Sequence, residues 1–253
     1  MDRLDSLLVK KGLVSSRTRG IYEIKKGNVL VDGKVFTKPS TKFNEDVVII
    51  INNKFDYVSK GALKLLKAID TFNIDLKDKV MLDIGSSTGG FSDVALRNNI
   101  KKIIAVDVGK DQFKLNDSRI ELHEGTDIRN FNIKEIIDVV TIDVSFISVT
   151  KIINKIEEIN PKEIVLLIKP QFECGKDIAD KYKGIPRNKE VHFDVIENII
   201  NEFKNINYNI QGLTYSPITG GSGNIEYLGY FTKDNIKEIN INEIINEAFK
   251  NFK

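Results

Sequence analysis

The chain has one cysteine, two histidines and no tryptophan among its 253 residues. The lone cysteine, Cys174, excludes a disulfide within the chain and is typical of a reducing compartment. Too few cysteines and histidines are present for a zinc centre, so we expect no metal site. Purely apolar runs are short, as in Val47–Ile51, whereas a membrane span needs about 20 residues. No signal peptide is visible, so we expect a soluble cytoplasmic protein that does not enter a membrane.

Negative charge is scarce at the start of the chain. Residues 1–43 carry ten Lys/Arg and four Asp/Glu, a balance of +6, whereas the whole chain has a net charge of +2. A basic first segment joined to a near-neutral body predicts a module that binds a polyanion. A solvated basic surface is the alternative, and charge alone does not separate the two.

The first 51 residues predict a small α+β unit. Apolar residues at helical spacing over 3–9 are followed by Gly12, and Ser15–Ser16 can cap a second helix that continues to Lys26. Gly20 inside that second helix is unfavourable for it. Residues 29–35 predict a hairpin with an Asp-Gly turn, and 47–51 a further strand.

The rest of the chain predicts an α/β domain, after a polar connection at 52–60. Apolar strand patterns alternate with helical ones, which indicates an open parallel sheet with helices on both faces. Two further strands have no helix between them and should form an antiparallel pair at one edge. That arrangement is typical of class I methyltransferases. The expected strands are 80–84, 102–107, 120–123, 138–143, 163–169, 206–215 and 225–232, and the expected helices are 89–98, 148–159 and 189–204.

A glycine-rich loop follows the first of these strands, in M-L-D-I-G-S-S-T-G-G-F-S-D (81–93). Phe91 stands where a phosphate-binding Walker loop requires lysine. Ser87 stands where a dinucleotide-binding loop requires its middle glycine. The remaining template, an acid followed by Gly85 and then Gly89-Gly90, suits S-adenosylmethionine. A purely structural turn is the alternative.

Two acids fit that cofactor. Asp83 at the strand end could meet the ammonium of its amino-acid part, and Asp107 could accept hydrogen bonds from both ribose hydroxyls. NAD enzymes use an acid in the same way, so Asp107 alone does not discriminate between the two cofactors.

Six segments in order resemble the motifs of the TlyA family, which are S-adenosylmethionine-dependent ribosomal RNA 2′-O-methyltransferases also known as haemolysin A. Residues 1–51, with R-L-D-S-L-L, S-S-R-T-R and G-N-V-L-V-D-G-K-V, are similar to the family's S4 RNA-binding domain. The resemblance covers nearly the whole chain and implies an S4-like domain over 1–58 and an FtsJ-like, Rossmann-like methyltransferase domain over 59–253. The six segments are V-S-K-G-A-L-K-L (58–65), D-I-G-S-S-T-G-G-F-S-D (83–93), A-V-D-V-G (105–109), I-D-V-S-F-I-S (142–148), I-K-P-Q-F-E (168–173) and G-N-I-E-Y-L (223–228).

The resemblance implies a Lys-Asp-Lys-Glu catalytic tetrad of Lys64, Asp143, Lys169 and Glu226. A ribose 2′-hydroxyl is a poor nucleophile, so direct in-line transfer needs tight positioning and a base. A partly desolvated lysine beside another lysine can act as a base. We expect Lys169 to have that role, with the other three orienting it. Taken singly, each of the four also has a purely structural explanation.

The resemblance also implies a set of binding residues. Asp127, in G-T-D-I-R, could meet the adenine amino group or be a simple turn residue, and Phe91 could line the pocket or pack in the core. The expected cofactor-binding residues are Asp83, Gly85, Ser86, Thr88, Gly89, Gly90, Phe91, Asp107 and Asp127. The expected RNA-binding residues are Arg3, Arg17, Arg19, Lys25, Lys26 and Lys60.

One departure concerns RNA contacts. The family commonly has arginine where this chain has Lys60, and lysine keeps the charge but loses bidentate phosphate geometry.

The partner implied is ribosomal RNA or a ribosomal subunit, with cytidine targets in 16S or 23S rRNA. The short segment after the last strand favours 23S. We expect neither DNA nor membrane binding, and the sequence does not indicate an oligomeric state. The alternatives are a ribosome-assembly factor without activity and a membrane-active haemolysin.

Overall fold

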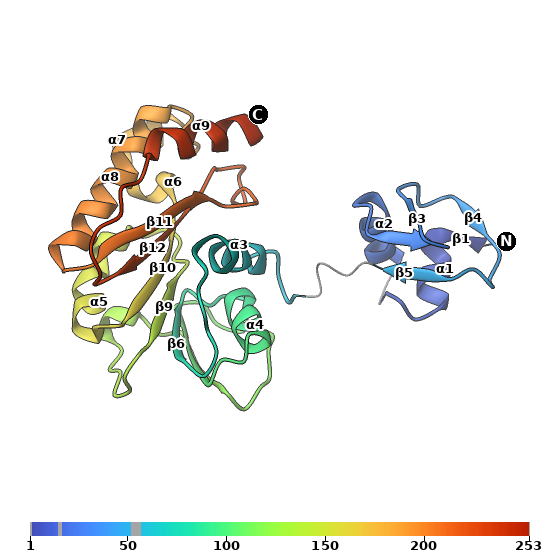
Figure 1. Cartoon of the computed structure of the whole chain (residues 1–253), viewed down its shortest axis with the longest axis horizontal. Helices are drawn as coiled ribbons and strands as arrows, with labels where there is room; N and C mark the ends of the chain where they lie inside the picture. The colour runs from blue at the N-terminus through green and yellow to red at the C-terminus, as the bar shows by residue number, and fades with distance from the viewer. Residues whose placement is uncertain (1, 15–16, 52–56, 253) are drawn as a thin grey trace. The chain divides into compact units, whose positions relative to one another are not determined.

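The structure is a computed structural model that describes residues 2–14, 17–51 and 57–252. It divides into two compact units, Met1–Asp56 and Tyr57–Lys253 (Figure 1). The proposed Ser15–Ser16 cap and part of the expected connection, 52–56, lie outside the described residues.

The first unit consists of two helices and short antiparallel strands, as the sequence predicts. The hairpin between β2 and β3 turns at Asp32 and Gly33, which both have positive φ angles, of 47° and 78°. The elements are β1 (Asp2–Arg3), α1 (Leu4–Lys10), α2 (Arg17–Lys25), β2 (Val29–Val31), β3 (Lys34–Phe36), β4 (Lys42–Phe43) and β5 (Ile49–Ile51). The strands pair in the orders β3-β2-β5 and β1-β4.

Gly20 lies inside α2, and its lack of a side chain has a packing reason. A Cβ at this position would lie 3.3 Å from the backbone oxygen of Asp5 and 3.4 Å from a methyl of Leu8. Glycine therefore lets α2 pack closely on α1, which outweighs its low helix propensity. Leu4, Leu8 and Ile24 of the two helices share one small core with β2.

The second unit contains a seven-stranded sheet in the order β11-β12-β10-β9-β6-β7-β8. The strands β10, β9, β6, β7 and β8 are parallel, and β12 is antiparallel to both β10 and β11. The predicted parallel sheet with an antiparallel edge pair is therefore confirmed. The strands are β6 (Val80–Ile84), β7 (Lys102–Asp107), β8 (Ile120–Glu124), β9 (Val139–Ile142), β10 (Glu163–Ile168), β11 (Asn209–Tyr215) and β12 (Tyr227–Thr232).

Helices cover both faces of this sheet (Figure 1). On β6, Met81 packs in the core that includes α3 and α4, whereas Leu82 packs in the core that includes α5, α8 and α9. The single helix expected at 148–159 is divided into η2 and α5. The helices are α3 (Ala62–Phe72), α4 (Gly90–Arg97), η1 (Ile128–Asn130), η2 (Val149–Lys151), α5 (Ile153–Ile159), α6 (Pro170–Glu173), α7 (Lys176–Lys181), α8 (Lys189–Asn205) and α9 (Ile241–Asn251).

The last helix, α9, contacts α8 and β11 and buries Ile245 and Ala248. Its apolar face is therefore used within the unit. Over the described residues, no helix combines the length and apolar character that crossing a bilayer requires.

Candidate functional site

Two adjoining cavities lie where the parallel strands β6, β7, β9 and β10 end. The first has a volume of about 460 Å³ and the second about 500 Å³. Both are lined by Gly85, Ser87, Asp143, Ser145 and Phe146. Ligand sites in open α/β sheets lie at this edge, and volumes of this size hold a nucleoside-sized ligand.

The first cavity combines apolar walls with Asp107, Asp127 and the shared Asp143. Ile84, Val106 and Ile128 provide apolar surface. Asp107 accepts hydrogen bonds from the backbone N–H groups of Ser87, at 2.7 Å, and Gly109, at 2.6 Å, which fix its carboxylate at the rim.

Asp127 also lines the first cavity, and it caps η1. Its carboxylate accepts from the backbone N–H of Arg129 at 2.9 Å and pairs with the Arg129 guanidinium at 2.5 Å. The hydrogen bonds from Arg129 lower the pKa of Asp127, so this acid is ionised at neutral pH.

Gly85 belongs to the glycine-rich loop and lines both cavities. Its φ is +82°, and a Cβ there would lie 2.5 Å from the backbone oxygen of Asp143. Only glycine permits this close approach of the β6 and β9 ends.

The other glycines of the loop have a packing role. A Cβ on Gly90 would lie 2.4 Å from Ser59 Oγ and 3.0 Å from the Ala62 nitrogen, so glycine lets the start of α4 approach the start of α3. Gly89, with φ +91°, precedes α4. Neither glycine lines the two cavities, and the same is true of Ser86 and Thr88.

Asp83 does not lie where we expected it, and Phe91 follows the second of its two interpretations. Asp83 is completely buried, and its two oxygens accept hydrogen bonds from Ser92 Oγ at 2.7 Å and Thr141 Oγ1 at 2.8 Å. Phe91 is 4% exposed and packs in the core beneath the loop. The structure therefore places both away from the cavity walls, because their side chains point into the layer between sheet and helices.

The residues present fit S-adenosylmethionine in the first cavity. It offers apolar surface for an adenine, the carboxylates of Asp107 and Asp127 for polar groups of a nucleoside, and the backbone of Gly85 in its wall.

The four tetrad residues meet at the second cavity, although they come from four parts of the chain. Lys64 lies on α3, Asp143 follows β9, Lys169 follows β10 and Glu226 precedes β12. Lys64 Nζ lies 2.8 Å from Glu226 Oε2 and 3.8 Å from Asp143 Oδ2. Lys169 Nζ lies 2.6 Å from Asp143 Oδ1.

These charges alternate in sign, and three of the four are buried, whereas the side chain of Asp143 is 20% exposed. Lys64, Lys169 and Glu226 are 8%, 6% and 3% exposed. Two ammonium groups and two carboxylates form a neutral network, which offsets part of the unfavourable desolvation of each group. Lys64 has two acidic partners, whereas Lys169 has Asp143 and the neutral hydroxyl of Ser145, at 2.8 Å.

Three further residues at the site were not predicted. Ser145 accepts from Lys169, and Phe146, which is 91% exposed with φ +64°, lies on the rim of both cavities. Gln171 donates from Nε2 to Glu226 Oε1 at 3.2 Å, and its buried Oε1 has no partner among the described residues. All three lie inside recognised motifs, but a single sequence gives no sign of which motif residues face a cavity.

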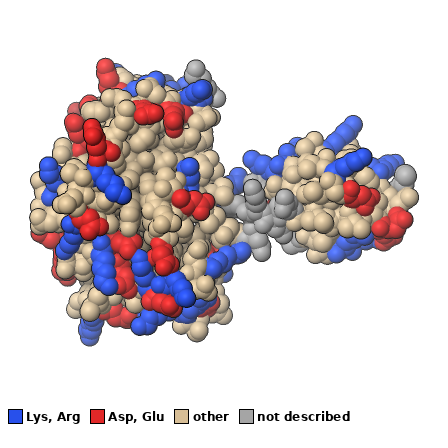
Figure 2. All heavy atoms as spheres, viewed as in Figure 1, with Lys and Arg blue, Asp and Glu red and all other residues tan. Residues whose placement is uncertain are grey.

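The predicted RNA-binding residues of the first unit lie on or near its two helices. Arg3 and Arg17 both pair with Asp5, Lys25 and Lys26 are exposed, and the side chain of Arg19 lies outside what the structure describes. Figure 2 shows Lys and Arg at several places on the visible face of this unit. Lys60, at the start of the second unit, is exposed just before α3.

Comparisons with known proteins agree with this division. The family described as FtsJ-like methyltransferase matches residues 57–233, and the S4 domain family matches residues 2–49. Methyltransferases of the first family use S-adenosylmethionine, the cofactor that the first cavity fits.

Individual relatives match over almost their whole length. A candidate rRNA methyltransferase of Bacillus subtilis, YqxC, is 39% identical and covers 100% of this chain and 95% of its own. The 23S rRNA (cytidine-2′-O)-methyltransferase TlyA of Campylobacter jejuni is 36% identical over 89% of this chain and 98% of its own. The solved structure of a candidate hemolysin from Streptococcus thermophilus is 34% identical with a TM-score of 0.74, and covers 99% of this chain and 96% of its own.

Replacing Gly85 by alanine should destabilise the second unit by about 3 kcal/mol, because a strained backbone and a steric clash add up at this position. Gly184→Ala is the matched control, since Gly184 has a φ of +74° in the same unit and an added methyl would meet nothing within 4 Å. It should cost only about 1 kcal/mol. Urea unfolding of both variants measures the difference, and equal losses would contradict the close approach to Asp143.

Asp83 should make stability fall as pH rises. Burial raises its pKa to about 6, against roughly 4 in an unfolded chain. The folded state therefore binds the proton more tightly, and the penalty for ionising Asp83 develops as pH rises from about 4 to 6. Between pH 4.5 and 7.5, Asp83→Asn should gain roughly 2 kcal/mol of unfolding free energy relative to the wild type.

Asp117→Asn is the control for this pH series. Hydrogen bonds from Arg119 hold the pKa of Asp117 down at about 2, so its contribution is lost only below this pH window. The stability of Asp117→Asn relative to the wild type should therefore stay nearly constant across it. A flat difference for Asp83→Asn would show that Asp83 is ionised without penalty.

Proposed function

Since the chain belongs to the TlyA family of FtsJ-like methyltransferases, we propose that it methylates the 2′-hydroxyl of a cytidine in ribosomal RNA. The observation that carries the proposal is the buried network of Lys64, Asp143, Lys169 and Glu226. It lies in a cavity that shares a wall with a second, nucleoside-sized cavity. A methyl donor in one and a ribose in the other would meet at the shared residues.

The first cavity is assigned to the cofactor. S-adenosylmethionine, when bound, supplies a methyl group on a positively charged sulfur. Asp107 and Asp127 would bind polar groups of its nucleoside part, and the backbone at Gly85 would lie against it. Asp83 supports the loop from below through Ser92 and Thr141, so we assign it a structural role.

The second cavity is assigned to the target nucleotide. The buried Gln171 Oε1 supports this assignment, because a buried acceptor without a partner is unfavourable until a ligand donates to it. Its orientation is defined: Glu226 accepts from Nε2, so Oε1 must be the free atom. A ribose hydroxyl or a base amino group could donate to it.

Lys169 is the proposed base. It has one carboxylate ion-pair partner against two for Lys64, so its amine is the less firmly held of the two. The amine would take the proton of the 2′-hydroxyl as the oxygen forms its bond to the methyl carbon. Asp143 would orient the resulting ammonium, and Lys64 would hold Asp143 and Glu226 in place.

The partner follows from both units. The match to the S4 domain supports binding of ribosomal RNA or a ribosomal subunit. We propose the exposed basic residues of the first unit, together with Lys60, as contacts to RNA phosphates. Binding to ribosomal RNA would place the protein in the cytoplasm, and we expect neither DNA nor a membrane as partner. We propose 23S rRNA, because the Campylobacter jejuni relative is named for that substrate.

An assembly factor without activity is the weaker interpretation. Four buried charges that only maintained structure could be replaced by apolar residues with little loss of stability. A membrane-lysing function is likewise weaker than methyl transfer. It would need an exposed apolar surface, and the apolar face of α9 packs on α8 and β11.

Lys169→Met should lower methyl transfer by roughly 100-fold or more, because it removes the base while filling similar space. Transfer of tritiated methyl from S-adenosylmethionine to ribosomal subunits measures this, followed by mapping of the modified nucleotide. Calorimetry should show cofactor binding within about threefold of the wild type, since Lys169 does not line the first cavity.

Lys162→Met is the matched control, because Lys162 is an exposed lysine that pairs with Asp138. It should leave transfer unchanged. Normal methylation by Lys169→Met would refute the base assignment, whereas wild-type protein that binds no cofactor would refute the proposed function itself.

A further inference from the structure

Asp5 is a charged residue in an apolar position. It lies on α1 between Leu4 and Leu8, which form the core of the first unit, and 0% of its surface is exposed. A buried carboxylate is strongly unfavourable unless it is paired and hydrogen-bonded. Its partners therefore explain why an acid occupies this position.

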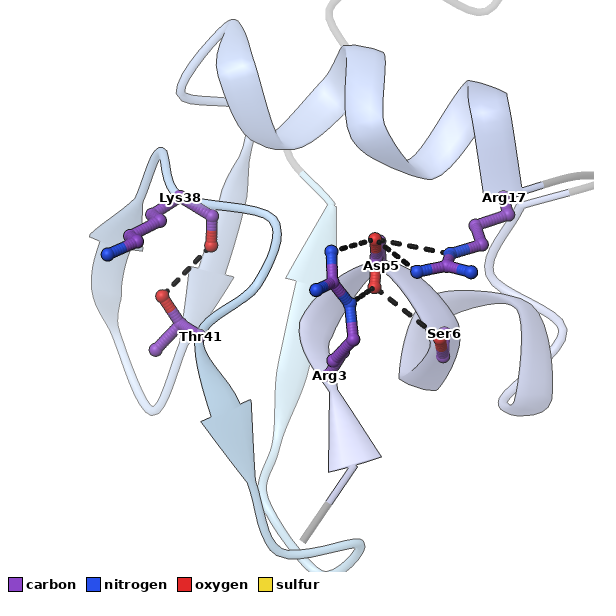
Figure 3. Close-up of polar contacts among 6 residues, drawn as sticks. All are labelled: Arg3, Asp5, Ser6, Arg17, Lys38 and Thr41. Carbon is purple, nitrogen blue, oxygen red and sulfur yellow. Dashed lines mark hydrogen bonds and ion pairs between the residues drawn. The ribbon is translucent and has the colours of Figure 1, made fainter.

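Two arginines converge on this carboxylate (Figure 3). Arg3 donates from Nε to Oδ1 at 3.0 Å and from Nη2 to Oδ2 at 2.9 Å. Arg17 donates from Nε and Nη2 to Oδ2, both at 3.2 Å. Hydrogen bonds from Arg3, and then from Arg17, lower the pKa of Asp5 to about 2, so the acid stays ionised throughout the physiological range.

The carboxylate of this cluster is buried, whereas the two arginine side chains that contact it are partly exposed to solvent. Their side chains are 42% and 56% exposed, whereas that of Asp5 is 0% exposed. A guanidinium has five N–H donors, and the contacts with Asp5 use Nε and Nη2 of each. Within the part of the chain that the structure describes, neither Nη1 group has a partner, so both can bind a ligand, and two cations against one anion leave a net charge of +1.

Arg3 precedes α1 and Arg17 begins α2, so the two arginines come from different elements. Their guanidinium groups lie near each other because both bind the carboxylate of Asp5. Long, exposed side chains otherwise sample many rotamers and lose that freedom when they bind. A planar guanidinium matches the oxygens of a phosphate, and two held side by side offer a preformed site for one.

We propose that Asp5 is a positioning residue that holds Arg3 and Arg17 as one rigid, two-guanidinium site for an RNA phosphate. The inference rests on the proposed function, because it takes RNA as the substrate. Asp5 itself would not touch the RNA; it acts through the two arginines.

The direction in which Asp5→Asn changes the affinity for RNA distinguishes a positioning role from a simple effect of charge. Asp5→Asn removes a negative charge from a surface that binds a polyanion, so charge alone predicts tighter binding. Loss of the positioning carboxylate instead predicts weaker binding, by roughly tenfold, together with a shallower salt dependence as about one phosphate contact is lost. Glu45→Gln is the matched control, because Glu45 is an exposed acid of the same unit that pairs with Lys10.

The experiment measures binding of the full chain to ribosomal subunits by filter binding over a series of salt concentrations. Weaker binding by Asp5→Asn, with Glu45→Gln equal to or tighter than the wild type, is the expected result. Tighter or unchanged binding by Asp5→Asn would overturn the proposal. Circular dichroism checks that the first unit remains folded in each variant.

A double variant tests the same proposal if Asp5→Asn does not fold. Arg3→Lys with Arg17→Lys keeps both charges and an ion pair to Asp5, but it removes the planar forks. Its affinity should also fall roughly tenfold. Unchanged affinity in this folded double variant would overturn the proposal.

Methyl transfer keeps the two proposals apart. Asp5→Asn should raise KM for the RNA and leave kcat unchanged, because Asp5 lies in a different unit from the tetrad. Wild-type protein that neither binds nor methylates RNA would defeat the proposed function. Wild-type protein that does both, with Asp5→Asn equal to it in KM, would defeat the role of Asp5 alone.

Discussion

Three buried charges and one half-buried charge must neutralise one another at the end of the sheet, and much of the second unit is arranged to let them do so. The register of the strands sets their positions. Ile168 of β10 is opposite Tyr227 of β12, so the next residue of one strand, Lys169, and the preceding residue of the other, Glu226, leave the sheet side by side. The parallel pairing of β9 with β10 brings Asp143 to the same edge. A shift of one strand would leave a charge buried without a partner, which is strongly unfavourable.

The same edge explains why two cavities share a wall. Gly85 lets the end of β6 approach Asp143 closely, so the glycine-rich loop and the tetrad become neighbours. The loop that we propose to lie against the methyl donor is thereby placed beside the residues proposed to deprotonate the acceptor. The methyl donor is reactive, so its transfer depends mainly on holding donor and acceptor close together in the right orientation.

In both units an acid is placed to orient a cation. Asp143 holds Lys169 in the second unit, and Asp5 holds Arg3 and Arg17 in the first. Each carboxylate is more buried than a surface ion pair would be, which fixes the cation that it contacts. In both proposals, the acids position and the cations act on the RNA.

Local sequence determined the elements and their order. Apolar runs and glycines located the strands of the main sheet, and ordered motifs located the loops between them, because both signals depend on neighbouring residues. The alternation of side chains along a strand also predicts the side on which Asp83 lies. Asp83 is two residues after Met81 on β6, so both side chains point to the same, helix-covered face of the sheet. The sequence could not show that Ser92 and Thr141 would satisfy it there, since they come from α4 and β9.

The sequence by itself therefore determined the fold class, the family and the residues able to carry charge. Only the tertiary structure decided which of them meet. Lys64 and Glu226 are 162 residues apart in the chain and 2.8 Å apart in space, and Gln171 completes the same cluster. Such contacts depend on strand register and on how α3 packs, and these follow from burial of the whole core and not from any local pattern.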